Sequence, residues 1–357
     1  MTSRDVTPTS LNHQRFQNAW PILRNDILGD FATKGMPGDA IDWYTKNLEY
    51  NTLGGKLLRG RAVVDSLAIL KGRVLTDEEY FQAAVLGWSV ELLQAFGLVA
   101  DDIMDQSLTR RGHPCWYKVG DVGLRAINDA CILEGTIFIL LKKHFRGRDD
   151  YIEIVELFRE MIYRTGMGQL LDVLTGPEHH VDLEKFSIER YRLIAIHKSA
   201  YFSIYLPIAL AMLMHGIPRE SPAHEAAMQI SFSLGEYGQV QDDFIDFAGS
   251  PEHTGKVGTD IVNNKCSWCI ITALALSKPE QRRVLEENYG RKGVENEGRV
   301  RTVFEQVGLR EQYAAYEEET YRRVTRMIEA IPDDEAAPAL KGGVFKAFLD
   351  KLYKRTK

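Results

Sequence analysis

The chain has 357 residues, of which 45% are hydrophobic and 26% charged, so it has enough apolar surface for a large core and is not expected to be disordered. Its formal net charge of −6 argues against a nucleic-acid-binding protein, because a polyanion needs a basic surface. Any site for a phosphorylated ligand must therefore be local.

The four cysteines, Cys115, Cys131, Cys266 and Cys269, are too few for a disulfide scaffold, so we expect reduced thiols and a cytoplasmic protein. Cys266 and Cys269 form a C-x-x-C, but no second ligand pair or thioredoxin-like strand accompanies it to favour metal or redox chemistry. The N-terminal stretch MTSRDVTPTSLNHQRF lacks the apolar core of a secretory signal. No apolar run approaches ~20 residues, so we expect no membrane span.

Most of the sequence favours helix, because apolar residues recur at three- and four-residue spacings while alternating strand patterns are scarce. The segment 77–105 is the clearest case, with acids in its first turn and apolar residues nearly all round its middle, as in a helix at the centre of a bundle. Pro207 is expected to kink or end its helix, since its ring removes a helical hydrogen bond. Further helices are predicted, in chain order, at 124–145, 151–176, 188–217, 223–249 and 266–276.

Turns between these helices are indicated by clusters of Gly and Pro. None of the clusters is long or biased enough to be an interdomain linker. The sequence therefore predicts an all-α fold in one continuous domain over residues 11–357, preceded by a flexible segment over residues 1–10.

The motif Asp-Asp-x-x-Asp occurs twice, as DDIMD and as DDFID. Residues four apart on an α-helix share a face, about 6 Å apart, so Asp101 points the same way as Asp105, and Asp242 the same way as Asp246. Like charges this close repel unless a cation lies between them. Mg²⁺ suits the position, because it is usually held by one or two carboxylates together with substrate phosphates. One copy would be a solvated helix end, whereas two copies, each after an apolar run and before basic residues, predict a site for Mg²⁺ and a diphosphate.

Basic residues near the two motifs could clamp the remaining phosphate oxygens. They are Arg110, Arg111, Lys198, Lys256 and Lys265. In the middle of a helical bundle such a site would lie above an apolar cavity, so we expect a substrate with an anionic head and a hydrocarbon tail.

A second anion site is indicated by NTLGGKLLRGR. Gly54 and Gly55 allow close backbone approach, and Lys56 and Arg59 fall one turn apart. Alone, a basic helix start is commonly just surface. Beside a metal-bound diphosphate, we interpret it as a metal-free pocket for a second diphosphate.

These residues resemble the family of trans-prenyl diphosphate synthases, and within it the eukaryotic farnesyl diphosphate synthases. The likeness runs from NTLGGKLLRG through LLQAFGLVADDIMDQSLTRRGHPCWY, GMGQLLDVL, HKSAYFSIYLPIA and GQVQDDFIDFAGSPEHTGKVGTDIVNNKCSW to the basic terminus YKRTK. It implies an isoprenoid synthase fold, which is a single large helical bundle around a central cavity, and a homodimer. It also implies about three Mg²⁺ ions, with isopentenyl diphosphate and allylic diphosphates as substrates.

The resemblance also assigns roles to single residues. Metal would be bound by Asp101, Asp105 and Asp242. These would be supported, directly or through metal-bound water, by Asp102, Asp243 and Asp246. The allylic diphosphate would be held by Arg110, Lys198 and Lys256. Isopentenyl diphosphate would be bound by Gly55, Lys56, Arg59, Gln94 and Arg111, under a closing C-terminus around Lys354 and Arg355.

Further positions match those that line the allylic chain and help to stabilise its carbocation, namely Lys198, Ser199 and Gln239. Ser199 stands where the family has threonine, and because the hydroxyl and carbonyl remain we expect little change in mechanism. Supporting roles around the same cavity are implied for Gln169, Asp172, Asp260 and Lys265.

The implied reaction is a head-to-tail (1′–4) condensation that gives farnesyl diphosphate. Mg²⁺ and basic groups stabilise the departing allylic diphosphate, the π-bond of isopentenyl diphosphate attacks the cation, and a proton is lost to the released diphosphate. Water must be excluded to protect the cation.

Two other classes of function are open. A terpene synthase, which is a lyase, also ionises an allylic diphosphate but needs no isopentenyl pocket, whereas this chain has both Lys56 and Arg59 and a complete second motif. A non-catalytic partner subunit would be free to lose metal ligands, whereas this chain keeps all six aspartates.

Product length depends on what blocks the growing tail below Asp101. The residues four and five positions earlier lie about one turn below it, and in the resembling farnesyl synthases both are usually aromatic. Here they are Gly97 and Phe96. The missing side chain at Gly97 leaves a cavity unless neighbours fill it, so we expect extension to geranylgeranyl diphosphate. The alternative is that Phe96, Phe138 or Phe202 fills the gap and farnesyl diphosphate is the end product.

Overall fold

The computed structural model describes residues 8–177, 180–249, 258–332 and 338–354. The chain is 76% helical, and its described residues contain one two-stranded hairpin, so the all-α class is confirmed. Contacts divide the chain into two compact units. The first is Met1–Arg159 with Leu206–Ser221 and Ala336–Ala339, and the second is Glu160–Tyr205 with Pro222–Glu335 and Leu340–Lys357. The single domain over 11–357 stays a prediction.

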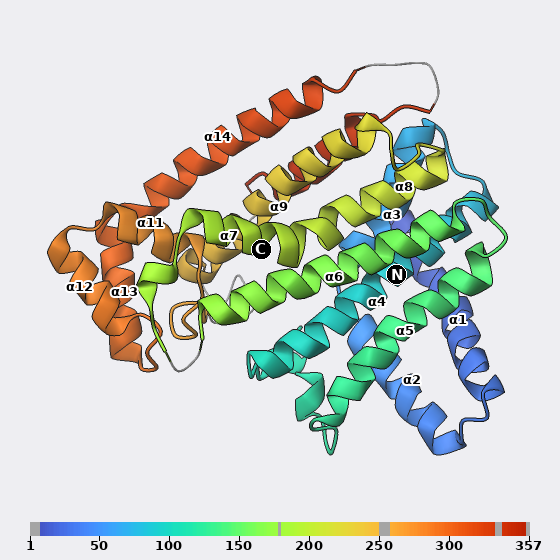
Figure 1. The fold of residues 1–357 in the computed structure, drawn as a ribbon, viewed down its shortest axis with the longest axis horizontal. Coiled ribbons are helices and arrows are strands. Elements are labelled where there is room, and N and C mark those ends of the chain that lie inside the picture. Colours follow the sequence, from blue (N-terminus) through green and yellow to red (C-terminus); the bar gives the residue numbers. More distant parts are fainter. Residues whose placement is uncertain (1–7, 178–179, 250–257, 333–337, 355–357) are drawn as a thin grey trace, which may run out of the picture. The chain divides into compact units, whose positions relative to one another are not determined.

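The first unit is built from helices and the hairpin (Figure 1). Its elements are α1 (Pro8–Thr33), α2 (Gly38–Thr52), α3 (Leu58–Lys71), α4 (Asp77–Met104), β1 (Thr109–Arg110), β2 (His113–Pro114), the 3₁₀ turn η1 (Trp116–Lys118), α5 (Arg125–Phe145) and α8 (Leu206–His215). The helix α6 (Tyr151–Thr175) begins in this unit. Helix α1 begins at Pro8, and residues 1–7 lie outside the described residues. The flexible segment over residues 1–10 stays a prediction.

Helix α4 is the centre of the first unit. Its N-terminus is closed by a capping box, in which the Thr76 hydroxyl accepts from the Glu79 N–H and the Glu79 carboxylate accepts from the Thr76 N–H. Its middle is buried all round because α1, α2, α3, α5 and α8 pack against it. Trp88 stacks on Phe16 of α1 at 4.9 Å between ring centroids, and its indole N–H donates to the Phe16 carbonyl. The predicted all-round apolar helix is therefore confirmed.

Helices α3 and α4 meet backbone to backbone at a pair of glycines. A Cβ placed on Gly60 would lie 2.7 Å from the Gly87 carbonyl oxygen, and one placed on Gly87 would lie 2.8 Å from the Phe16 ring. Real Cβ contacts are essentially never this short, so only glycine permits the approach.

The second unit carries the remaining elements (Figure 1). They are the rest of α6, the 3₁₀ turn η2 (Leu183–Lys185), α7 (Ile188–Ile194), the π-helix η3 (Ala195–Tyr205), α9 (Pro222–Ala248), α11 (Trp268–Leu276), α12 (Pro279–Asn288), α13 (Val294–Gln306), α14 (Leu309–Glu329) and α15 (Gly343–Leu352). The backbone stays helical from Ile188 to His215, so the helix does not end at Pro207. It changes from π-helix to α-helix just before this proline.

The core of the second unit surrounds the C-terminal half of α9. Phe244 stacks on Tyr313 of α14 at 3.8 Å, and Phe247 meets Phe304 of α13 edge to face. Trp268, the first residue of α11, is buried in the same cluster. These contacts fix the helix that carries the second aspartate motif.

Two helices, Asp77–Met104 and Ile188–His215, are long and apolar enough to cross a membrane by length and composition alone. Of their most apolar windows, 72% and 61% are buried inside the structure, as in core helices of soluble proteins. The absence of a membrane span therefore stays a prediction.

Replacing Gly87 with Ala should lower the free energy of unfolding by about 2–3 kcal/mol, because the added methyl group would overlap α3. Gly97→Ala in the same helix is the matched control, since a Cβ there meets nothing within 4 Å. The control should be neutral or slightly stabilising, because Ala favours helix over Gly by about 1 kcal/mol. Thermal melting followed by circular dichroism measures both, and equal melting temperatures for the two variants would contradict the close approach.

Candidate active site

The first aspartate motif lies at the C-terminus of α4. Asp105 caps the helix, and its N–H donates to the Asp101 carbonyl at 2.8 Å, so the two side chains are one turn apart. Both are partly exposed, whereas Asp102 is buried. A helix C-terminus carries partial negative charge, so carboxylates there are unfavourable unless cations compensate them. The position therefore suits a bound cation.

Arg110 supplies part of that compensation. Its Nε and Nη2 atoms donate to Asp102 Oδ1 at 3.1 and 2.5 Å, and Nη2 lies 3.5 Å from Asp101 Oδ2. Cys115 also contacts Asp102, and burial together with this carboxylate raises the pKa of the thiol to about 12. Asp102 is thus bonded within the protein, and its supporting role at a metal stays a prediction.

The paired arginines lie on a tight hairpin that the sequence did not predict. Thr109 pairs with Pro114 and Arg110 with His113. The two turn residues, Arg111 and Gly112, both have positive φ, 54° and 78°, as a two-residue hairpin turn requires. The glycine that follows the two arginines was the sequence signal that could have predicted this turn.

Arg111 reaches the segment that holds the predicted isopentenyl pocket. Its Nη1 donates to the Leu53 carbonyl at 2.6 Å, and its Nη2 would lie 2.9 Å from a Cβ on Gly55. Lys56, which follows Gly55, is exposed, and Arg59, in the first turn of α3, is partly buried. The structure thus brings Arg111 to Gly55.

Gln94 lies on α4, between the basic segment and the first motif in sequence. Its Oε1 is buried and has no hydrogen-bond partner among the described residues. A buried amide with an unused polar atom fits a ligand-binding role.

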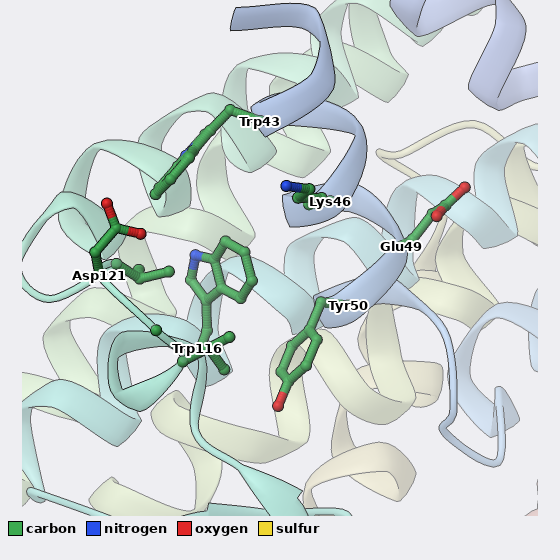
Figure 2. A pocket seen from close by; sticks show the side chains of 9 residues that line it. Trp43, Lys46, Glu49, Tyr50, Trp116 and Asp121 are labelled. Atoms are coloured by element: carbon green, nitrogen blue, oxygen red, sulfur yellow. The ribbon is translucent and has the colours of Figure 1, made fainter. Parts of the chain in front are cut away.

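The hairpin is braced from the side by aromatic residues that line a pocket of about 480 Å³ (Figure 2). The Asp129 carboxylate accepts from the indole N–H groups of Trp43 and Trp116 at 2.9 and 2.8 Å. Tyr50 donates to the Pro114 carbonyl at 2.7 Å. These bonds tie the end of the hairpin to α2 and α5, which the sequence did not predict.

The second aspartate motif lies near the C-terminus of α9. Asp242 is exposed, whereas Asp243 and Asp246 are buried. Asp246 accepts from the N–H groups of Thr259 and Asp260 at 3.2 and 3.0 Å, so it fixes the loop beyond the motif. The backbone of Asp260 therefore lies at the motif, and its supporting role stays a prediction.

Asp243 is the most deeply bonded member of the motif. Its oxygens accept from the Trp268 N–H at 2.8 Å and from Gln239 Nε2 at 3.0 Å. Burial raises the pKa of Asp243, although these hydrogen bonds oppose the rise. The Ser199 hydroxyl lies 3.4 Å from Gln239 Oε1, so Ser199, Gln239 and Asp243 form one chain of polar contacts.

The two lysines of this unit converge on Asp172. Lys198 Nζ lies 2.6 Å and Lys265 Nζ 3.3 Å from Asp172 Oδ2, and only 10% of the Asp172 side chain is exposed. Burial alone would raise the pKa of Asp172, but the two ammonium groups outweigh it and hold the pKa below its ordinary value. Asp172 is therefore the residue that positions both lysines, a role that sequence spacing could not show.

Lys198 and Ser199 belong to the π-helix η3, which passes very close to its neighbours. A Cβ on Gly168 of α6 would lie 2.7 Å from Lys198 Cα, and one on Gly235 of α9 would lie 2.8 Å from Ala200 Cα. Gln169, the residue after this contact, is partly buried. The glycines allow η3 to present Lys198 to Asp172 and Ser199 to Gln239.

The remaining residues singled out in the sequence are those of the basic C-terminus, Lys256 and the C-x-x-C cysteines. Of these, Lys256 and Arg355 lie outside the described residues. Lys354 is exposed, with its Nζ 4.0 Å from Glu318 Oε1. Cys266 and Cys269 are buried thiols whose pKa burial raises, and Cys269 donates to the Asp243 carbonyl. They pack beside the second motif as structural residues.

A family model for polyprenyl synthetase matches residues 41–307. The chain belongs to the polyprenyl synthetase family. It is therefore a prenyltransferase, as the sequence resemblance implied. It is 55% identical to a farnesyl pyrophosphate synthase of Ganoderma lucidum, over 96% of this chain and 98% of that protein. It is 47% identical to the farnesyl pyrophosphate synthase of Saccharomyces cerevisiae, over 97% and 98% of the two chains.

The fold comparison agrees. A Trypanosoma brucei farnesyl diphosphate synthase, complexed with the bisphosphonate BPH-722, matches with a TM-score of 0.89 and 31% identity, over 97% of this chain and all of that one. The predicted isoprenoid synthase fold is confirmed. Extension to geranylgeranyl diphosphate finds no support among these relatives, and the farnesyl alternative fits them better. A Cβ on Gly97 would meet nothing within 4 Å.

Asp172→Asn should destabilise the protein by about 3 kcal/mol at neutral pH, because two partly buried lysines lose their counter-ion. The pKa of Asp172 is lowered in the folded state, so its contribution is present above the unfolded pKa and is lost as the pH falls through the folded pKa. The difference in melting temperature between the variant and the unaltered protein should therefore shrink as the pH falls below about 4. Asp121→Asn, at an exposed pair with Arg125, is the control and should leave melting unchanged. A pH-independent difference for Asp172→Asn would contradict the ion-pair account.

Proposed function

We propose that the chain condenses isopentenyl diphosphate head to tail with dimethylallyl diphosphate and then with geranyl diphosphate, and releases farnesyl diphosphate. The observation that carries this proposal is the 55% identity to a farnesyl pyrophosphate synthase over almost the whole of both chains, a length that includes both aspartate motifs and the basic segment at Lys56 and Arg59. Family membership alone would leave the substrate open.

The aspartate motifs fit a divalent metal of the hard, oxygen-preferring kind. Among the described residues no three His, Cys, Asp or Glu side chains form a ready-made metal group. That suits Mg²⁺, which takes one or two carboxylates and completes its shell with water and substrate phosphates. Asp101, Asp105 and Asp242 would hold it, and we propose about three ions, as the resemblance implies. When bound, the metal would neutralise the diphosphate and assist its departure.

The chain's own residues would orient and stabilise the reacting groups. Arg110, Lys198 and Lys256 would hold the allylic diphosphate, and the Ser199–Gln239 pair would face the developing cation. Gly55, Lys56, Arg59, Gln94 and Arg111 would hold isopentenyl diphosphate, with Lys354 and Arg355 closing over it. Fixed donors of this kind act on charge that develops in the transition state.

Incubation with dimethylallyl diphosphate, excess isopentenyl diphosphate and Mg²⁺ should give farnesyl diphosphate as the longest product, identified by mass spectrometry. The same mixture with a chelator in place of Mg²⁺ should give none, because the departing diphosphate would be uncompensated. Accumulation of geranylgeranyl diphosphate would contradict the assigned end point. A cyclised hydrocarbon would indicate a terpene synthase, and no turnover a non-catalytic subunit.

We also propose a homodimer. On the part of α6 that lies in the second unit, Tyr163, Met167, Leu170 and Leu174 form an apolar stripe at three- and four-residue spacing and are 71%, 44%, 61% and 56% exposed. Such a stripe on one helix face is typical of a contact between proteins. A second copy of this chain is the occupant that the resemblance implies.

Leu170→Glu should convert the dimer into monomers, because a carboxylate would be buried in an apolar interface. Size-exclusion chromatography with light scattering measures the mass. Val74→Glu, at an isolated side chain that is 85% exposed, should leave it unchanged. A monomeric unaltered protein, or a Leu170→Glu variant of unchanged mass, would overturn this interface.

We propose a cytoplasmic location. The four cysteines are all free thiols, which fits a reducing compartment. The net charge of −6 also fits a protein that has no nucleic-acid partner.

A further inference from the structure

Glu91 is a buried acid to which neither the motifs nor the comparisons assign a role. It lies on α4, three residues before Gln94, and is 4% exposed. Burial of a carboxylate is costly unless hydrogen bonds and opposite charge compensate it. The compensation comes from the segment that holds the predicted isopentenyl pocket.

The first compensation is the N-terminus of α3. The residue at the N-cap position, Leu57, has a left-handed conformation (φ 51°) and offers no capping side chain. Glu91 Oε1 instead accepts from the Gly60 N–H at 2.7 Å, and the carboxylate also accepts from the Arg59 N–H. These are the donors that an N-cap side chain would satisfy, so a residue from another helix caps α3.

The glycine contact between α3 and α4 makes this reach possible. A Cβ on Gly60 would lie 2.7 Å from the Gly87 carbonyl oxygen and 2.9 Å from Glu91 Cγ. Gly87 is one turn before Glu91 on α4. The two glycines thus bring the α3 N-terminus onto the Glu91 side chain.

The second compensation is positive charge. The guanidinium groups of Arg59 and Arg111 act electrostatically on Glu91, and they oppose the rise in its pKa that burial causes. Arg111 is further held by the Leu53 carbonyl and lies against Gly55. One carboxylate therefore contacts the helix start that carries Arg59 and attracts both guanidinium groups.

We infer that Glu91 is a positioning residue for the isopentenyl diphosphate pocket: from α4 it caps the N-terminus of α3 and orients Arg59 and Arg111 toward that diphosphate. This rests on the proposed function, because it takes that pocket as the isopentenyl site. Glu91 is buried, and it acts through the N-terminus of α3 and through the charges of Arg59 and Arg111. Its loss should affect isopentenyl diphosphate selectively, because Arg59 and Arg111, on which it acts, are both assigned to the isopentenyl pocket.

The test compares Glu91→Gln with Glu91→Ala. Gln keeps an oxygen for one backbone N–H but loses the charge and the second acceptor, so it should raise the KM for isopentenyl diphosphate about tenfold, as expected for one charge-assisted hydrogen bond. Ala loses both acceptors and should raise it about 100-fold. The KM for dimethylallyl diphosphate should change less than about twofold in the Gln variant, because its site keeps all its residues.

Equilibrium binding of isopentenyl diphosphate, measured by calorimetry without Mg²⁺, gives a readout independent of turnover, since this pocket is predicted to be metal-free. The dissociation constant should rise by the same factors at a temperature below melting. Asp26→Asn is the control: it also replaces a partly buried carboxylate of the first unit, bonded to Lys143 and His144 of α5, and should lower the melting temperature without changing this constant.

The outcomes are separable. The positioning role would be overturned if Glu91→Gln bound isopentenyl diphosphate with an unchanged dissociation constant. If the unaltered protein also bound and condensed this substrate, the proposed function would stay intact. An equal rise of both KM values would also overturn it, because a general structural role predicts that result. Unaltered protein that neither binds isopentenyl diphosphate nor condenses it would overturn the proposed function and the inference together.

Discussion

Mutual repulsion among carboxylates on one helical turn is the constraint on which both aspartate motifs depend. In each motif the residue after the first aspartate is buried and bonded within the protein: Asp102 to Arg110, and Asp243 to the Trp268 N–H and to Gln239. Asp242, by contrast, is exposed. Internal donors thus compensate part of the negative charge of each motif.

Much of the fold could be predicted because its signals are local. The acids and the apolar middle of α4 predicted a helix at 77–105, and the structure has Asp77–Met104. The helices predicted at 124–145, 151–176 and 223–249 agree within one residue at each end. The segments of α12 and α14 are rich in Glu and Arg, and their apolar residues are too few to predict a helix. These helices are stabilised by the packing of a few buried residues.

The site was predicted less completely, because its remaining members depend on contacts between residues far apart in the chain. The resemblance assigned Lys198 to the allylic diphosphate and Lys265 to a supporting role, but only the folded chain shows that both converge on Asp172. Glu91 was missed for the same reason, since its partners Arg59 and Gly60 belong to another helix. Asp172 and Glu91 are both acids to which no direct contact with substrate or metal is assigned. Each is placed to hold basic residues in position.

The π-helix η3 decides the direction in which the polar residues that it carries point. A π-turn holds one residue more than the α-turn it replaces, so its formation is equivalent to a single-residue insertion absorbed without breaking the helix. Lys198 and Ser199 lie inside this stretch, while the buried α-helix that contains Pro207 begins directly after it. A change from π- to α-helix in this stretch would therefore turn Lys198 away from Asp172 and Ser199 away from Gln239.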